Sequence, residues 1–82
     1  MGSLNEYVDM LDLVEDYLDE FEGDYPRFVA YTKAQQRIGQ AFFNSLSQHD
    51  QVILRGSFYD PFYRDTPKDL VRCIEWLLFR GK

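Results

Sequence analysis

The side chains that most often carry covalent or metal chemistry are scarce in this sequence. Cys73 is the one cysteine and His49 the one histidine among 82 residues. Nucleophilic catalysis needs a nucleophile beside a base, and a zinc site needs several Cys or His ligands at characteristic spacing. Cys73 falls on the apolar side of a predicted helix, whereas His49 falls in a polar turn. We therefore expect a buried, unreactive thiol, a surface imidazole, no metal and no cofactor.

Carboxylates are plentiful, but their arrangement does not indicate acid–base catalysis. A catalytic carboxyl pair needs two different environments that separate the two pKa values. Most acidic residues gather on one solvated helix face, and Asp60, beside Pro61 among aromatic residues, is the best single candidate. An aspartate before proline is more typical of a turn. The glycines, at positions 2, 23, 39, 56 and 81, form no phosphate-binding loop. The sequence therefore predicts a protein that is not an enzyme.

Charge is distributed unevenly along the chain. The first 24 residues carry nine acidic side chains and no basic one, whereas residues 25–82 carry nine basic and five acidic ones. The net charge of −5 argues against direct binding of nucleic acid, whose affinity comes from neutralised phosphates. One helix face, opposite an apolar stripe, holds a set of acids that we call the acidic face: Asp9, Asp12, Asp16, Asp19 and Glu20.

The acidic face contains no lysine or arginine that could form i,i+4 ion pairs. Such a face can simply be solvated. It can also dock onto a basic protein surface, or imitate the phosphates of DNA. Because unpaired like charges cost stability, a partner with opposite charge becomes more plausible.

Aromatic residues suggest a second contact region. Near the C-terminus, Arg72, Trp76 and Phe79 point away from the predicted core, and Trp with Arg is typical of interface anchors. The alternative is that the loop over residues 56–65 folds over Trp76 and buries it. That loop has four aromatics, which we expect to pack on the core: Phe58, Tyr59, Phe62 and Tyr63. Stacking on single-stranded nucleic acid would need flanking basic residues, and acidic neighbours cancel those present.

Apolar spacing predicts the helices that position these residues. A helix over 4–22 has its apolar stripe at steps of three and four residues: Leu4, Tyr7, Val8, Leu11, Val14, Leu18 and Phe21. Displaced from this stripe is a second apolar set, Met10, Leu13 and Tyr17. A second helix is predicted over 26–46, with Asp24 as its cap and Pro26 in its first turn. A short connection makes these two helices an antiparallel hairpin.

The remaining elements are shorter. The segment 51–54 fits either a short helix, capped by Ser47 and ended by Gly56, or a short strand, and we favour the helix because no second strand exists to pair with it. A C-terminal helix over 66–79 begins with Thr66 as N-cap and Pro67 at the first helical position.

Together these elements predict an all-α fold, a small compact three-helix bundle with a short extra helical segment. Residues 1–82 form a single domain, and Met1-Gly2-Ser3 is typical of an expression remnant. We expect no signal peptide, because the first residues have no basic region followed by an apolar run. The longest apolar run, residues 76–79, is far too short to span a membrane. With one free thiol, the expected location is the cytoplasm.

Four short motifs stand out in the middle of the chain: Arg37-Ile38-Gly39-Gln40, Asn44-Ser45-Leu46, Arg55-Gly56-Ser57 and Asp60-Pro61-Phe62-Tyr63. They resemble the pattern Arg-x-Gly-Gln, Asn-x-Leu, Arg-Gly-Thr and Asp-Pro-Phe-Tyr of short uncharacterised proteins of bacteriophages and some bacteria. The resemblance covers about residues 36–63, with Ser57 in place of the usual threonine. It implies a phage or mobile-element origin and brings no established function.

The sequence thus favours a non-catalytic protein-binding module, which in a phage would bind and modulate a host protein in takeover or anti-defence. Two surfaces would carry the binding, namely the acidic face and the Arg72–Trp76–Phe79 edge. One alternative is an acidic DNA mimic that inhibits a nucleic-acid-binding protein. Another is a structural homo-oligomer or virion component, which would bury Met10, Leu13, Tyr17 or Trp76 against a copy of itself.

Overall fold

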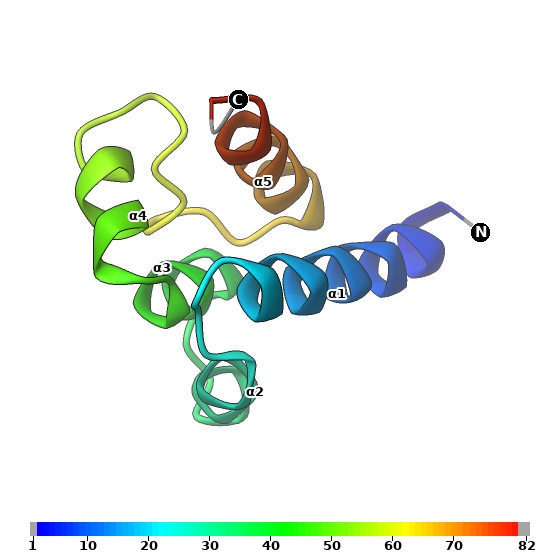
Figure 1. Ribbon diagram of the computed structural model, residues 1–82. Coiled ribbons are helices and arrows are strands. Elements are labelled where there is room, and N and C mark those ends of the chain that lie inside the picture. The colour runs from blue at the N-terminus through cyan, green and yellow to red at the C-terminus, as the bar shows by residue number, and fades with distance from the viewer. Residues whose placement is uncertain (1, 81–82) are drawn as a thin grey trace.

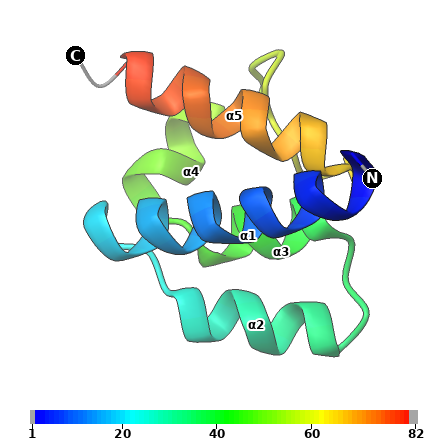
Figure 2. The same cartoon turned by 90° about the vertical axis from the view of Figure 1, so that its right-hand side faces the viewer.

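The computed structural model describes the backbone of residues 2–80 and the side chains of residues 8–79. Within this range it is all-helical, with α1 (Gly2–Glu20), α2 (Tyr25–Lys33), α3 (Ile38–Ser45), α4 (Gln48–Leu54) and α5 (Pro67–Arg80). The helices pack into a small bundle in which α1 lies between α5 and α2 (Figures 1 and 2). The all-α bundle predicted from the apolar spacing is therefore confirmed.

Three helix starts form where the sequence places cap residues. The Asp24 carboxylate accepts a hydrogen bond from the backbone N–H of Arg27, with Pro26 in the first turn of α2. The Ser47 hydroxyl accepts from the N–H of Asp50 at the start of α4, and Thr66 accepts from the N–H of Asp69 at the start of α5. Each side chain satisfies a backbone donor that a helix end leaves unpaired. The helical interpretation of residues 51–54 is confirmed as well.

The single helix predicted over 26–46 is wrong, because the chain breaks between α2 and α3. Gln35 adopts a left-handed conformation at φ 68°, and the N–H of Gln36 turns back to the carbonyl of Tyr31 at 3.1 Å. The break lets the chain fold back, so that α2 and α3 pack against each other. On a straight helix Phe28 and Phe42 would lie roughly 21 Å apart, at 1.5 Å per residue. In the folded-back chain both rings are fully buried in one core.

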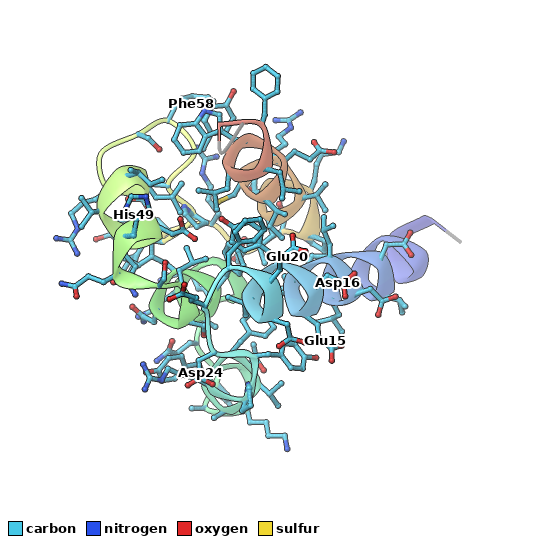
Figure 3. The ribbon with its side chains drawn as sticks, in the orientation of Figure 1. Glu15, Asp16, Glu20, Asp24, His49 and Phe58 are labelled. Atoms are coloured by element: carbon cyan, nitrogen blue, oxygen red, sulfur yellow. The ribbon has the colours of Figure 1, made fainter. Side chains whose placement is uncertain are left out.

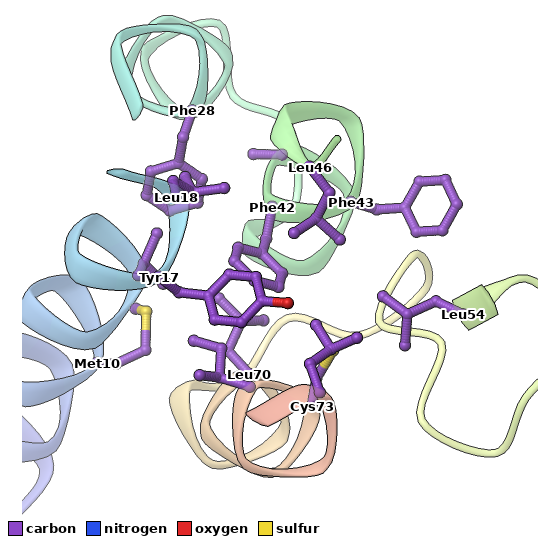
Figure 4. Close-up of a cluster of buried hydrophobic side chains, with 14 residues drawn as sticks. Met10, Tyr17, Leu18, Phe28, Phe42, Phe43, Leu46, Leu54, Leu70 and Cys73 are labelled. Atoms are coloured by element: carbon purple, nitrogen blue, oxygen red, sulfur yellow. The ribbon is translucent and has the colours of Figure 1, made fainter. Parts of the chain in front are cut away.

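The core of the bundle is formed by one cluster of buried side chains from all five helices (Figure 4): Met10, Val14, Tyr17, Leu18, Phe28, Ala41, Phe42, Phe43, Leu46, Leu54, Leu70, Cys73, Ile74 and Leu77. The inner face of α1 is therefore rotated from the predicted stripe. Met10 and Tyr17 are buried, whereas Val8 and Phe21 are exposed. The side chains of Leu4 and Tyr7 lie outside the described residues.

The rotation arises because α1 has neighbours on two sides. It packs on α5 as well as on α2, with α3 behind it (Figure 2). A helix covered on two flanks buries a wider arc than a single stripe. Since Met10 and Tyr17 belong to the chain's own core, neither is available as the anchor of a homo-oligomer. Leu13 and Trp76, the other two residues named for that alternative, are half-buried.

Candidate functional site

The thiol and the imidazole belong to different helices, Cys73 to α5 and His49 to α4. Cys73 is buried in the core, and burial raises the pKa of its thiol to about 12. His49 is exposed on α4 (Figure 3). Among the described residues, no three His, Cys, Asp or Glu side chains gather as a metal ion would require. The structure thus places the thiol and the imidazole as the sequence predicted.

Asp60 holds the loop that follows α4. Its carboxylate accepts a hydrogen bond from the backbone N–H of Phe62 at 3.0 Å, an Asx turn that reverses the chain at Pro61. The turn-forming interpretation of Asp60 is confirmed. Gly56, at φ 82°, ends α4 in the left-handed conformation expected of it.

The loop packs directly against α3 at Gly39, and we call this contact the seat of the loop. The N–H of Gly39 donates to the carbonyl of Arg64 at 3.0 Å. A Cβ at position 39 would collide with the carbonyl oxygens of Pro61 and Arg64. Only glycine allows this close approach. Two of the four short motifs noted in the sequence, at 37–40 and 60–63, therefore meet in space to fix the loop against the helix.

The loop, so fixed, forms one wall of a groove whose other wall is α5. The groove has a volume of about 430 Å³. We call it the aromatic groove, and its lining residues are Phe58, Tyr59, Arg64, Asp69, Arg72, Glu75, Trp76 and Phe79. It contains all three residues of the predicted α5 edge. The loop contributes partners that the sequence did not assign to this surface.

Trp76 is stacked rather than either fully exposed or fully covered. The ring of Tyr59 lies nearly parallel to it, with centroids 5.3 Å apart and an angle of 17° between the planes. Trp76 is therefore half-buried and still lines the groove. Of the two predicted outcomes for Trp76, the structure adopts an intermediate one, in which the loop covers one face of the indole.

Two phenylalanines that line the groove are largely exposed to solvent. The side chain of Phe58 is 79% exposed and that of Phe79 is 81% exposed. Phe58 keeps its orientation through an edge contact with Tyr59 and through Arg64, whose guanidinium carbon lies 6.0 Å from the ring centroid. Held in this way, Phe58 projects from the molecule (Figure 3). Exposed rings of this size around a hollow are typical of a contact surface.

The prediction that all four loop aromatics pack on the core is correct for only part of the set. Phe62 meets Phe43 edge-on, with centroids 5.7 Å apart, and Tyr59 stacks on Trp76. Phe58 and Tyr63 point into solvent instead. The density of aromatics in residues 58–63 is the sequence signal that could have assigned this loop to a binding surface.

Four charged side chains surround the apolar centre of the groove. Arg64 and Arg72 are basic, and Asp69 and Glu75 are acidic. Opposite charges around an aromatic centre form the polar rim found at many protein interfaces. The groove as a whole therefore has no strong preference for a charged partner, and its rings are its most distinctive chemical feature.

The acidic face lies on α1, on a different part of the surface. All five of its members are exposed. The structure does not bring Asp9, Asp12, Asp16, Asp19 or Glu20 into the aromatic groove. The two surfaces proposed from the sequence are thus separate in space.

Comparisons with known proteins found no similar protein. No protein-family model matches the sequence, and neither the curated proteins nor the solved structures provide a match. Within the described part of the chain, no helix is long and apolar enough to cross a membrane.

Proposed function

We propose that this protein is a non-catalytic protein-binding module whose principal contact surface is the aromatic groove. The observation that carries the proposal is the pair of phenylalanines, Phe58 and Phe79, each about four-fifths exposed beside the stacked Tyr59 and Trp76. Apolar rings that the chain leaves in water gain most when a partner covers them. Buried aromatic anchors also supply most of the affinity at protein interfaces.

The hydrogen bonds and close packing of the groove's loop wall support a binding role. Its loop wall is fixed by the Asx turn of Asp60 and by the seat at Gly39, and its helix wall is α5. A surface that is already ordered loses little conformational entropy when it binds. If the chain comes from a phage, as the motif resemblance implies, the partner would be a host protein in the host cytoplasm.

For the partner held at the aromatic groove, the acidic face would assist association rather than hold the complex. Its exposed carboxylates create a negative field that speeds encounter with a basic partner, and salt weakens this effect. A second function, imitation of nucleic-acid phosphates, is supported by one specific observation, the exposure of all five of these acids. The mimic predicts that the partner binds DNA and that DNA displaces this chain from it.

Comparative capture from a cell lysate tests the proposal. Three baits are compared by quantitative mass spectrometry: the wild type, Phe58→Ser/Phe79→Ser, and Val52→Ser. Val52 is the matched control, because it is an apolar side chain 62% exposed on α4, outside the groove. We expect a protein retained by the wild type and the control and lost from the double variant. Equal retention by all three baits would contradict the proposal, as would a stable homo-oligomer that retains no other protein.

A further inference from the structure

A second surface follows the contact between α1 and α5, which lie side by side and run in the same direction (Figure 2). Two hollows occur one after the other along this contact. The first, about 290 Å³, is lined by Asp9, Pro67, Lys68 and Val71. The second, about 130 Å³, has an apolar floor that includes Leu13, Ile74 and Leu78, with Asp16 and Glu20 at its edge. We call the two hollows together the α1–α5 seam.

The α1 side of the seam is one stripe of the helix. Positions 9, 13, 16 and 20 are separated by four, three and four residues, and such positions lie above one another on a helix. The stripe is roughly 16 Å long at 1.5 Å per residue, which corresponds to about three helical turns. In this stripe the apolar Leu13 follows the acidic Asp9 and precedes two further acids, Asp16 and Glu20. This is the length over which a short helix could lie along the seam.

The two hollows differ in charge. Asp9 and Lys68 line the first hollow together, so the charges of its described lining balance. The second hollow has two exposed carboxylates, Asp16 and Glu20, and its described lining contains no basic side chain. Glu20 lies on the α5 side of α1, whereas Glu15 lies on the α2 side (Figure 3). The negative charge of this end is therefore directed at the seam, and the described lining of the second hollow contains no countercharge.

We propose that the α1–α5 seam binds a basic amphipathic helix of a partner protein. Its apolar side chains, spaced at i, i+3 or i+4, and i+7, would enter the two hollows, as in other complexes of a helix in a groove. Its lysines or arginines would lie over Asp16 and Glu20, where the seam has uncompensated charge. The inference rests on the proposed binding function and deepens it by naming the chemistry of the partner at a surface separate from the aromatic groove.

A designed peptide tests the seam directly. The probe is a fluorescently labelled 14-residue helix with leucines at the apolar spacing and lysines elsewhere, and its binding is followed by fluorescence anisotropy. The variant Asp16→Asn/Glu20→Gln removes both charges at the second hollow. The matched control Glu15→Gln/Glu22→Gln removes two exposed acids that line neither hollow. Both variants change the net charge equally and leave the core intact.

We expect Asp16→Asn/Glu20→Gln to weaken peptide binding about 3- to 10-fold, as the loss of two partly solvated ion pairs would. The control should change it less than about twofold, because charges away from a contact are largely screened. In the wild type, the amide chemical shifts of residues 13–21 and 71–78 should move on titration. The same leucine pattern with glutamates in place of lysines should not bind.

Several results would overturn the inference. One is the absence of peptide binding, and another is equal weakening by the two variants, which would indicate nonspecific attraction. The inference would also be overturned if the amide chemical shifts changed only at the aromatic groove. Displacement of the peptide by self-association of the chain would overturn it as well. The Phe58→Ser/Phe79→Ser variant should bind the peptide as the wild type does. Failure of the seam therefore remains distinguishable from failure of the aromatic groove.

Discussion

The hydroxyl of Tyr17 donates a 2.9 Å hydrogen bond to the carboxylate of Asp50, which lies 33 positions later in the chain. Both side chains are buried, and the bond ties α1 to the first turn of α4. A carboxylate is costly to bury without a partner. The bond therefore allows α4 to pack with Asp50 facing the interior.

Replacing Tyr17 by phenylalanine removes this donor and leaves the carboxylate of Asp50 buried without it. We expect the free energy of unfolding to fall by about 1–3 kcal/mol. Tyr63→Phe is the matched control, because its hydroxyl belongs to a side chain that is 81% exposed. Urea unfolding of both variants gives the comparison. Equal stability of Tyr17→Phe and Tyr63→Phe would show that the buried bond contributes nothing.

Stability should decline at alkaline pH. Burial raises the pKa of Cys73 from 9.0 to about 12, and burial with the bond to Asp50 raises the pKa of Tyr17 above its ordinary value of 10.0. Both groups lose their protons more readily in the unfolded chain, so their stabilisation is complete below pH 9 and is lost as the pH rises. In Cys73→Ala, the decline should begin about one pH unit higher. A curve of stability against pH that is flat from 8 to 11 would contradict this.

Gly39→Ala should disrupt the seat of the loop. The added methyl group collides with backbone oxygens of Pro61 and Arg64, which cannot rotate away as side chains do. We expect a loss of at least about 2 kcal/mol, at the upper end for overpacking. Gly56→Ala meets no atom within 4 Å and incurs only the cost of its left-handed backbone, roughly 1 kcal/mol. A higher melting temperature for Gly39→Ala than for Gly56→Ala would be inconsistent with this close contact.

Leu18→Ala tests the core of α1. Leu18 is fully buried against the other helices. Its truncation should cost about 2–5 kcal/mol, the sum of lost transfer energy and a residual cavity. Val52→Ala, on the exposed side of α4, should change stability by less than about 0.5 kcal/mol. Chemical denaturation measures both, and a similar midpoint for the two variants would show that Leu18 is not in the core.

The parts of the fold that could be predicted from the sequence are those with local causes. The caps Asp24, Ser47 and Thr66 each act on a backbone N–H three residues away, so their effect is visible in the sequence. The break at Gln35 has no local signal, because its neighbours are good helix formers. The break accompanies the packing of α2 against α3, a tertiary contact that local spacing does not show.

The same distinction holds for the candidate site. Arg72, Trp76 and Phe79 could be placed on one side of α5 from helical spacing alone. The contributions of Phe58 and Arg64 could not, because the path of a loop has no period. That path depends on the close contact of the loop with Gly39, where a side chain would collide with the loop backbone. In the sequence this position is visible only as a glycine inside a predicted helix.

The dissociation rate of the captured partner tests the central claim, binding through the aromatic groove, most directly. It is measured for the wild type, Phe58→Ser/Phe79→Ser and Val52→Ser at one salt concentration. Because buried anchors act mainly on dissociation, the groove variant should release the partner at least about tenfold faster. Val52→Ser should stay within about twofold of the wild type. Release of the partner from the groove variant at the wild-type rate would contradict the account.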